Sequence, residues 1–547
     1  MGDNAGATVG EKVGNDLHLV SWNVAGWKAT LDHIRRFKGG LGAFLEGHRV
    51  DVLCLQEVKL TAKALEAEGG KLEGEMRGYE SFWACNEGSA AQRQGFNGVA
   101  TLARQGAVMR ADCAPLRDPE LDGEARCLLT DHGEFVLFNA YAPNASAGAR
   151  LPFKLRWFAA LRSAMARERA AGKKVVLAGD LNTRFRSCDA YWSLRHVDVN
   201  ALCSMPLAQC DAMGPQTSEA VEAIRREWPG IREALRNKEC RPMETRSTAT
   251  GKPLSKWGLW AKDKSGQMVR LGVPLETEEQ ASRSFLVDGA GVRCDGTVEF
   301  GADAEYAEHS LQAPGTLSLS DLADCLKRLA NVELPMEARK RLADAFGQPA
   351  DAPAMRDWVR AVLEQDGMVD CFGELHPDAE SRFTCWNQLY NSRFQNVGSR
   401  IDYILVDRAL FKGRARSGLG LFSPGGHGPD SAAAAAAAAT LGGLSEPAPL
   451  AGGGLPPLGE HEYAAHFREG PSTGIIYMPP QLSDHAAVSL LLGGCELQAD
   501  GRASARDAGT LRCQPHRSAK RITDFFGKRK APTPADVPMG KKAELGA

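Results

Sequence analysis

The sequence predicts an α/β protein in which polar site residues follow buried strands. Apolar residues over 175–178 lead through a glycine into Asp180 and Asn182, and the alternating stretch 17–23 ends at Asn23. The segment 151–171 carries apolar residues at helical spacing before the 175–182 strand. Ligands and reacting groups of α/β sheets commonly lie at the carboxyl ends of strands, so these polar residues are candidates for a site.

Length, charge and cysteine content bound the class of protein. The chain has 547 residues, which is more than one core usually holds, so we expect one large catalytic domain with insertions and a tail, or two domains. The formal net charge is -2, so any basic binding face must be local. The 14 cysteines form no C-x-x-C pair and no apolar signal segment opens the chain, which indicates reduced, intracellular thiols.

Neither a zinc finger nor a membrane span is predicted. Cys513 and His516 lie near each other, but two ligands cannot close a tetrahedral zinc site. No run approaches the roughly 18 apolar residues that indicate a membrane span.

The expected elements alternate, apart from one long interruption. A flexible N-terminus covers 1–16, and a catalytic domain covers 17–493. The pattern predicts strands at 17–23, 50–57, 97–102, 134–141, 175–182, 400–406 and 488–492, and helices at 31–44 and 151–171. Between about 198 and 355 the alternation is lost, and we expect an insertion without chemistry, with helices at 219–235, 318–329 and 334–346 around a polar middle.

Two further segments are low in complexity. The stretch 413–460 includes eight consecutive alanines, Ala432–Ala439, and is expected to be a loop. Residues 494–547 are polar and basic, and we expect a disordered tail.

Nine polar residues at or near strand ends suggest a shared site: Asn23, Glu57, Tyr141, Asn144, Asp180, Asn182, Asp402, Asp484 and His485. Four carboxylates repel one another in one pocket unless a cation is present, and these oxygen ligands suit Mg²⁺ or Mn²⁺. Phosphodiester cleavage needs charge neutralisation, an activated water and protection of the leaving oxygen. A metal on Glu57, a base at Asp180 and an Asp484–His485 dyad would supply them. Each residue alone is equally compatible with a turn or a solvated strand end.

Six motifs, taken in order, resemble the exonuclease III family of apurinic/apyrimidinic (AP) endonucleases. They are Ser21-Trp22-Asn23, Leu55-Gln56-Glu57, Tyr141-Ala142-Pro143-Asn144, Gly179-Asp180-Leu181-Asn182, Arg400-Ile401-Asp402-Tyr403 and Ser483-Asp484-His485. The stretches Leu375-His376-Pro377 and Phe383-Thr384-Cys385-Trp386, with the long chain beyond the core, resemble the eukaryotic second-type AP endonucleases. The resemblance covers about 17–200 and 355–493.

The resemblance implies a four-layer α/β sandwich, in which two packed mixed β-sheets are flanked by helices and the active site lies at one edge. It implies catalytic roles for Tyr141, Asp180, Asn182, Asp402 and His485, and substrate contacts from Asn144, Asn182 and Trp386. The implied Mg²⁺ or Mn²⁺ ligands are Asn23, Glu57, Asp180, Asn182, Asp484 and His485. The implied partner is double-stranded DNA with abasic sites or with damaged or mismatched 3′ ends, and the implied compartment is the nucleus, with an organelle as an additional one.

Two departures from the family pattern bear on activity. Ala25 stands where the family often has Asp or Asn, which removes one metal or water contact. Cys385 and Ser399 stand where some relatives line the abasic-sugar pocket with aromatic residues. We therefore expect 3′-end processing and 3′→5′ exonuclease action to be strong relative to abasic incision.

The tail contains a degenerate motif for the sliding clamp PCNA. Ile522, Phe525 and Phe526 have the spacing of a one-turn plug, whereas Ala519 replaces the usual Gln, so a random apolar cluster is about equally compatible. The basic run Lys528-Arg529-Lys530 would serve nuclear import or phosphate attraction.

Two other readings remain open on the sequence. One is a relative in the same superfamily that acts on a phosphoester other than DNA. The other is a catalytically weak, nuclease-like module that docks DNA or PCNA, which applies if Ala25 has disabled the metal site.

Overall fold

The computed structural model describes residues 16–86, 95–246, 253–282, 284–285, 287–288, 290–295, 306–312, 315–377, 379–388, 392–393, 395–412, 415–417, 474–476, 482–495 and 520–521. The flexible N-terminus predicted before Asp16 and nearly all of the alanine-rich loop lie outside these residues. So do the clamp-motif residues Ile522, Phe525 and Phe526, the basic run Lys528–Lys530 and the pair Cys513 and His516.

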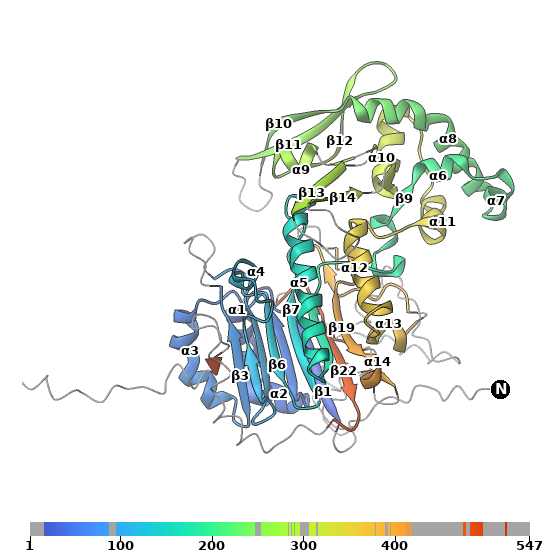
Figure 1. Ribbon diagram of the computed structural model, residues 1–547. Helices are drawn as coiled ribbons and strands as arrows, with labels where there is room; N and C mark the ends of the chain where they lie inside the picture. The colour runs from blue at the N-terminus through green and yellow to red at the C-terminus, as the bar shows by residue number, and fades with distance from the viewer. Residues whose placement is uncertain are drawn as a thin grey trace, which may run out of the picture.

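The first sheet brings together strands from both ends of the chain (Figure 1). Strand β1 pairs parallel with β2 and antiparallel with β22, so the N-terminal and C-terminal motifs lie side by side. In order across the sheet, the strands are β20 (Ala415–Ser417), β22 (Ala487–Leu492), β1 (Leu17–Asn23), β2 (Val52–Gln56), β4 (Val99–Arg104), β3 (Tyr79–Ala84) and β23 (Lys520–Arg521), and β21 (Ile475–Ile476) also pairs with β22.

The second sheet has six strands and is also mixed, because β7 and β8 are parallel and the other pairs are antiparallel. In order, they are β16 (Met368–Asp370), β19 (Asp402–Asp407), β8 (Lys174–Asp180), β7 (Phe135–Tyr141), β6 (Cys127–Asp131) and β5 (Arg110–Asp112).

Three buried layers of apolar side chains separate four layers of structure. One lies between the two sheets and includes Leu19 and Val176. A second lies between the first sheet and helices α1 (Trp27–Phe37), α2 (Leu41–Gly47) and α3 (Ala62–Glu75). A third lies between the second sheet and helices α5 (Leu151–Ala170) and α12 (Pro353–Glu364). The four-layer α/β sandwich is confirmed.

A buried polar contact joins the two sheets near the ends of their central strands. Gln56 Nε2 donates to Asn139 Oδ1 at 2.8 Å, and Asn139 Nδ2 donates to the carbonyl of Ala100 at 2.7 Å. Both side chains are fully buried, so an apolar replacement of either one would leave the other without its partner. This contact fixes one sheet against the other beside the motif residues.

The structure corrects two expectations about the elements. The predicted helix 31–44 is two helices, α1 and α2, because Gly39 and Gly40 adopt φ of 74° and 97° and end the helical path. The prediction also missed β3, β5 and β6. Glu57, expected to end its strand, lies one residue beyond β2 with φ of 52°.

The insertion has a hydrophobic core of its own. The predicted helices appear as α8 (Pro215–Arg236), α10 (Leu319–Ala330) and α11 (Met336–Phe346), whose buried faces meet around Ile224, Leu326 and Leu342. The polar middle, for which no strand was predicted, forms strands in the structure. It contains the sheet β10 (Glu239–Arg246), β11 (Pro253–Lys262) and β12 (Met268–Leu275) and the pair β13 (Ala290–Asp295) and β14 (Tyr306–Gln312).

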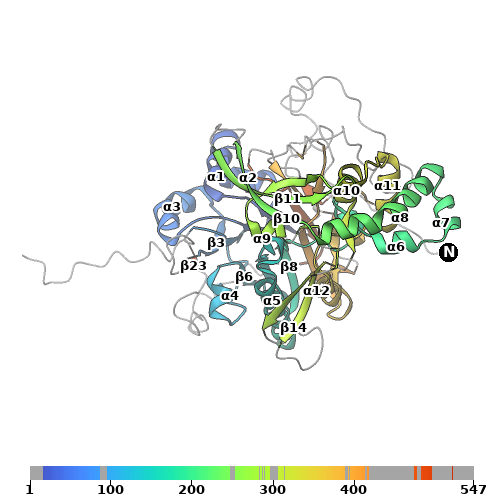
Figure 2. The same cartoon turned by 90° about the horizontal axis from the view of Figure 1, so that it is seen from above.

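The remaining elements of the insertion are short. They are α6 (Val199–Ser204), α7 (Leu207–Ala212), α9 (Glu278–Ser282) and the pair β9 (His196–Asp198) and β15 (Thr316–Ser318). The insertion lies beyond the ends of the two sheets at which α5 begins, and Figure 2 looks down on it, with β10, β11, α8 and α10 in front of the sheets. Among the described helices, none is long and apolar enough to cross a membrane.

Strands β7 and β8 approach so closely at Gly179 that one added methyl group there should lower the stability of the protein. A Cβ at Gly179, where φ is 146°, would lie 1.9 Å from the carbonyl oxygen of Ala140. We expect Gly179→Ala to lower the free energy of unfolding by about 1–3 kcal/mol, because the strands must separate to admit it. Denaturant unfolding measures the change. Gly230→Ala, in the interior of α8 with nothing near its Cβ, should have no effect or stabilise.

Candidate active site

Three adjacent strands of the second sheet place their site residues side by side. Asp180 is the last residue of β8, and it pairs in register with Asp402 of β19 on one side and Tyr141 of β7 on the other. Asp180 and Asp402 are each only 1% exposed. Two buried carboxylates on neighbouring strands therefore face one region at the edge of the sheet.

The first sheet adds Asn23 and Glu57 to this region. Asn23 Nδ2 donates to Glu57 Oε1 and to Asp180 Oδ2, both at 3.0 Å. Glu57 Oε2 forms an ion pair with Lys59 Nζ at 2.8 Å, and Tyr141 donates a hydrogen bond to the same carboxylate. The amide of Asn23 thus connects the carboxylates of the two sheets.

His485, two residues before β22, completes the cluster. Its Nδ1 is 2.8 Å from Asp402 Oδ2, and its Nε2 is 3.9 Å from Asp180 Oδ2. Ser483 holds this segment in place, since its Oγ donates to the carbonyl of Asn23 at 2.7 Å and accepts the N–H of His485 at 3.0 Å. Asp402 therefore orients the imidazole toward Asp180.

The surroundings raise the pKa values of both Asp180 and His485, which suits Asp180 to accept a proton and His485 to carry a positive charge. Burial and the neighbouring Asp402 charge raise the pKa of Asp180 above its usual range. Burial alone would lower the pKa of His485, but Asp402 and Cys385 together outweigh it and raise that pKa well above 6.5. Burial likewise opposes ionisation of Glu57, yet hydrogen bonds from Asn23 and Lys59 lower its pKa. Glu57 is thus a carboxylate and His485 an imidazolium at neutral pH.

The donor set fits a hard divalent cation. Ligand atoms of Asp180, Asp402 and His485 lie within 4.8 Å of one another. Asp402 Oδ1 is buried and has no hydrogen-bond partner within the described residues, so this oxygen atom is open to a further ligand. Oxygen-rich sites of this kind prefer Mg²⁺ or Mn²⁺.

Ala25 contacts both Asn23 and Lys59 through its backbone. Its N–H donates to Asn23 Oδ1 at 3.0 Å, and its carbonyl accepts from Lys59 Nζ at 2.8 Å. Lys59 therefore bridges the backbone of Ala25 and the carboxylate of Glu57. The chain supplies its own cation to Glu57, with which a metal ion would compete.

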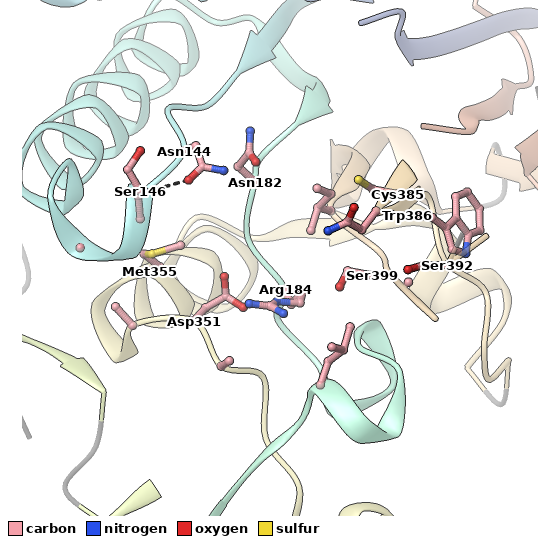
Figure 3. Close-up of a pocket in the computed structure, with 18 of the residues that line it drawn as sticks. Asn144, Ser146, Asn182, Arg184, Asp351, Met355, Cys385, Trp386, Ser392 and Ser399 are labelled. Atoms are coloured by element: carbon pink, nitrogen blue, oxygen red, sulfur yellow. Dashed lines mark hydrogen bonds and ion pairs between the residues drawn. The ribbon is translucent and has the colours of Figure 1, made fainter. Parts of the chain in front are cut away.

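Asn182 and Asn144 lie at the edge of a cavity beside this cluster. The N–H of Asn182 donates to Asp180 Oδ1 at 2.7 Å, and its Nδ2 donates to the carbonyl of Ala142 at 3.0 Å. Asn144 is exposed, and its Oδ1 accepts the N–H of Ser146 at 2.7 Å. Both asparagines line the cavity (Figure 3).

Asp484 and Trp386 lie farther from the central carboxylates. Asp484 groups with Cys385 and His485 within 4.8 Å. Trp386 lines the cavity, but it is 1% exposed and its indole donates to Asn396 Oδ1 at 3.1 Å. Of the predicted residues, these two and Asn144 do not contact the Asn23–Glu57–Asp180 network directly.

Sequence reasoning missed several residues that position the site. Lys154 is fully buried in α5, and its Nζ donates to the carbonyls of Leu181 and Asn182 at 3.1 and 2.6 Å. Its signal was a lysine on the apolar face of that helix. Lys59, two residues after Glu57, and Ser483, inside a recognised motif, could also have been found. Thr384, whose Oγ1 accepts the N–H of Asp402 at 3.2 Å, lies inside the recognised stretch 383–386 and could have been found in the same way.

Comparisons with known proteins find that part of this sequence is similar to a known family. Residues 20–209 match the sequence model of the Endonuclease/Exonuclease/phosphatase family. The chain is 30% identical over 216 residues to DNA-(apurinic or apyrimidinic site) endonuclease 2 of Bos taurus, a match that covers 32% of this chain and 40% of the relative. It is 31% identical over 175 residues to the DNA repair nuclease APEX1 of Danio rerio, covering 32% of this chain and 51% of that protein.

A solved structure, the catalytic domain of Xenopus laevis APE2, aligns with 73% of this chain and 85% of its own, at 19% identity and a TM-score of 0.36. The chain spans 40% of the length of the Bos taurus relative. The resemblance to AP endonucleases is confirmed by the named relatives. Asp402 and His485 lie outside the family match and join its residues only through the fold.

Proposed function

We propose, from the premise that residues 20–209 carry an endonuclease/exonuclease/phosphatase domain, that the chain is a DNA repair nuclease dependent on Mg²⁺ or Mn²⁺. Its reaction is hydrolysis of the phosphodiester at abasic sites and at damaged or mismatched 3′ ends, in base excision repair. The observation that supports it most strongly is the convergence of Asp180, Asp402 and His485 beside the Asn23–Glu57 pair.

Each residue of the cluster has a chemical role in this proposal. Asp180, whose pKa is raised, accepts the proton of the attacking water. His485, held by Asp402, presents an imidazolium N–H to a phosphate oxygen. Asn182 binds the phosphate, with its backbone carbonyl fixed by Lys154. Tyr141 and Asn144 add a phenol and an amide at the phosphate.

The metal would be held by side-chain oxygen atoms with Glu57 at the centre, supported by Asp180, Asn182 and Asn23, with Asp484 beside them. His485, predicted as a further ligand, would in its protonated form bind the phosphate instead of the metal. When bound, it would supply positive charge to the phosphodiester. The competing Lys59 ammonium and the missing side-chain oxygen at Ala25 lead us to expect weak metal affinity.

The first experiment assays the full chain on two labelled duplexes, one with an internal abasic analogue and one with a recessed, mismatched 3′ end. With Mg²⁺ we expect digestion of the recessed end and weaker incision of the abasic duplex, and excess EDTA should abolish both. Equal abasic incision would contradict the expected preference for 3′ ends. Binding of both duplexes without cleavage in Mg²⁺ or Mn²⁺ would favour the docking-module reading, and cleavage of only a non-DNA phosphoester would favour a phosphatase.

The proposal extends to location and partners. Nuclear localisation and binding to PCNA depend on tail residues outside the described structure, so they rest on the sequence motif alone. A pull-down of PCNA by the full chain, lost on Phe525→Ala with Phe526→Ala, would support the clamp contact.

A further inference from the structure

A cavity of about 770 Å³ lies beside the proposed catalytic cluster, with walls from two distant parts of the chain (Figure 3). The sandwich supplies Asn144, Asn182 and Ser399, and the end of the insertion supplies Ala350, Asp351 and Met355. Its volume lies within the usual range of ligand pockets, about 300–1,000 Å³. The insertion, to which the sequence assigned no chemistry, therefore forms part of the wall of this pocket.

Arg184 and Asp351 are the two charged residues among those that line the cavity. Arg184 follows Asp180 by four residues on the same loop, and its Nε donates to Asp351 Oδ2 at 2.6 Å. The arginine side chain is 22% exposed and the aspartate side chain 6%. Figure 3 shows the guanidinium directed toward the carboxylate across the cavity. As a pair, they leave the cavity with no net charge.

A neutral cavity next to a phosphodiester-cleaving centre discriminates between two kinds of nucleotide. If the nucleoside in the cavity is the last of its strand, it ends in a hydroxyl and is uncharged beyond the scissile phosphate. If the strand continues, the same nucleoside carries a second phosphate. An unpaired Arg184 would attract that phosphate with a full positive charge, whereas the Asp351 carboxylate neutralises this charge and itself repels the phosphate.

We propose that the Arg184–Asp351 pair makes this cavity selective for a strand-terminal nucleoside over one whose strand continues. This inference rests on the proposed function, and it names Arg184 and Asp351 as residues that determine the substrate class. No other charged group occurs among the lining residues that the structure describes, so the inference assigns the selectivity to this pair.

Small nucleotides test the pair without cleavage. Binding of thymidine 5′-monophosphate and thymidine 3′,5′-bisphosphate to the full chain is measured by calorimetry in EDTA. The wild type should bind the monophosphate at least as tightly as the bisphosphate. Asp351→Asn should improve bisphosphate binding about tenfold or more relative to the monophosphate, because hydrogen bonds to a charged group are strong once the guanidinium is free. Arg184→Gln with Asp351→Asn should lose that gain.

A matched control comes from a similar ion pair elsewhere. Arg162 Nη2 lies 2.7 Å from Asp366 Oδ1, with side-chain exposures of 17% and 16%, outside the cavity residues. Asp366→Asn should leave the ratio of the two affinities unchanged. An unchanged ratio in Asp351→Asn, or no binding of either nucleotide to the wild type, would overturn the inference.

Cleavage then separates this inference from the proposed function. In Mg²⁺, Asp351→Asn should raise the ratio of internal abasic incision to terminal removal by about the same factor. DNA cleavage with an unchanged ratio would overturn the role of the pair while leaving the nuclease intact. The predicted shift in nucleotide binding without any DNA cleavage would overturn the nuclease while supporting the pair.

Discussion

Replacing Asp180 by Asn should lower the rate of DNA cleavage by about a thousandfold, the usual contribution of a positioned proton acceptor. The amide keeps the shape of the side chain and can still accept the N–H of Asn182, which is 2.7 Å from Asp180 Oδ1. It cannot accept a proton from water, and it weakens the contact with Asn23. Single-turnover cleavage of the recessed duplex in saturating Mg²⁺ measures the loss.

A second buried acid provides the matched control for this change. Asp122 lies in α4 (Pro119–Gly123) and is 5% exposed, and its carboxylate accepts the N–H groups of Leu116 and Asp118 at 3.1 and 3.2 Å. Asp122→Asn makes the same chemical change and should leave the cleavage rate within a few-fold. Cleavage by Asp180→Asn at the rate of this control would refute the assignment of the base.

Replacing Arg400 by Met should lower the free energy of unfolding by about 3–5 kcal/mol, because it strands two buried carboxylates. Arg400 is 1% exposed. Its Nε is 2.8 Å from Asp189 Oδ1, and its Nη2 is 2.6 Å from Asp370 Oδ2. Small domains have only about 5–15 kcal/mol in total, so the variant should unfold at much lower denaturant and accumulate poorly.

The comparison variant removes an arginine from a more exposed pair. Arg169 Nη2 is 2.8 Å from Asp407 Oδ1, with side-chain exposures of 22% and 14%. Arg169→Met should lower the free energy of unfolding by about 1 kcal/mol or less, because water can solvate the carboxylate of Asp407 that remains. Equal losses in the two variants would mean that Arg400 contributes no more than an exposed ion pair.

The local part of the site could be predicted from the sequence where a residue ends a strand whose apolar pattern is visible. Asn23 ends β1 as expected, and Asp180 ends β8. Their convergence could not be derived from periodicity, since the Asn23–Asp180 contact spans 157 residues and the His485–Asp402 contact spans 83. It was predicted only through the ordered motifs that resemble a known family.

The rest was missed for identifiable physical reasons. Strand β10 has exposed and half-buried residues in near alternation and few apolar side chains, so its sequence does not mark it as a strand. The Arg184–Asp351 pair joins residues 167 apart, and either residue alone resembles an ordinary surface charge. The break between α1 and α2 occurs at two glycines, Gly39 and Gly40, which do not interrupt the helical spacing of the apolar residues in the sequence.

The pairing of β9 with β15 determines the entropic cost of closing the inserted loop. The chain leaves at Asp198 and returns opposite it at Thr316, so the pair closes a loop within the insertion, and α10 and α11 follow that loop. Closing a flexible loop of that length costs roughly 4 kcal/mol, and each doubling would add only about 0.6 kcal/mol. The core around Ile224 and Leu326 can offset that cost by its own burial. A sandwich can therefore acquire, enlarge or lose such a loop while its six motifs stay in register.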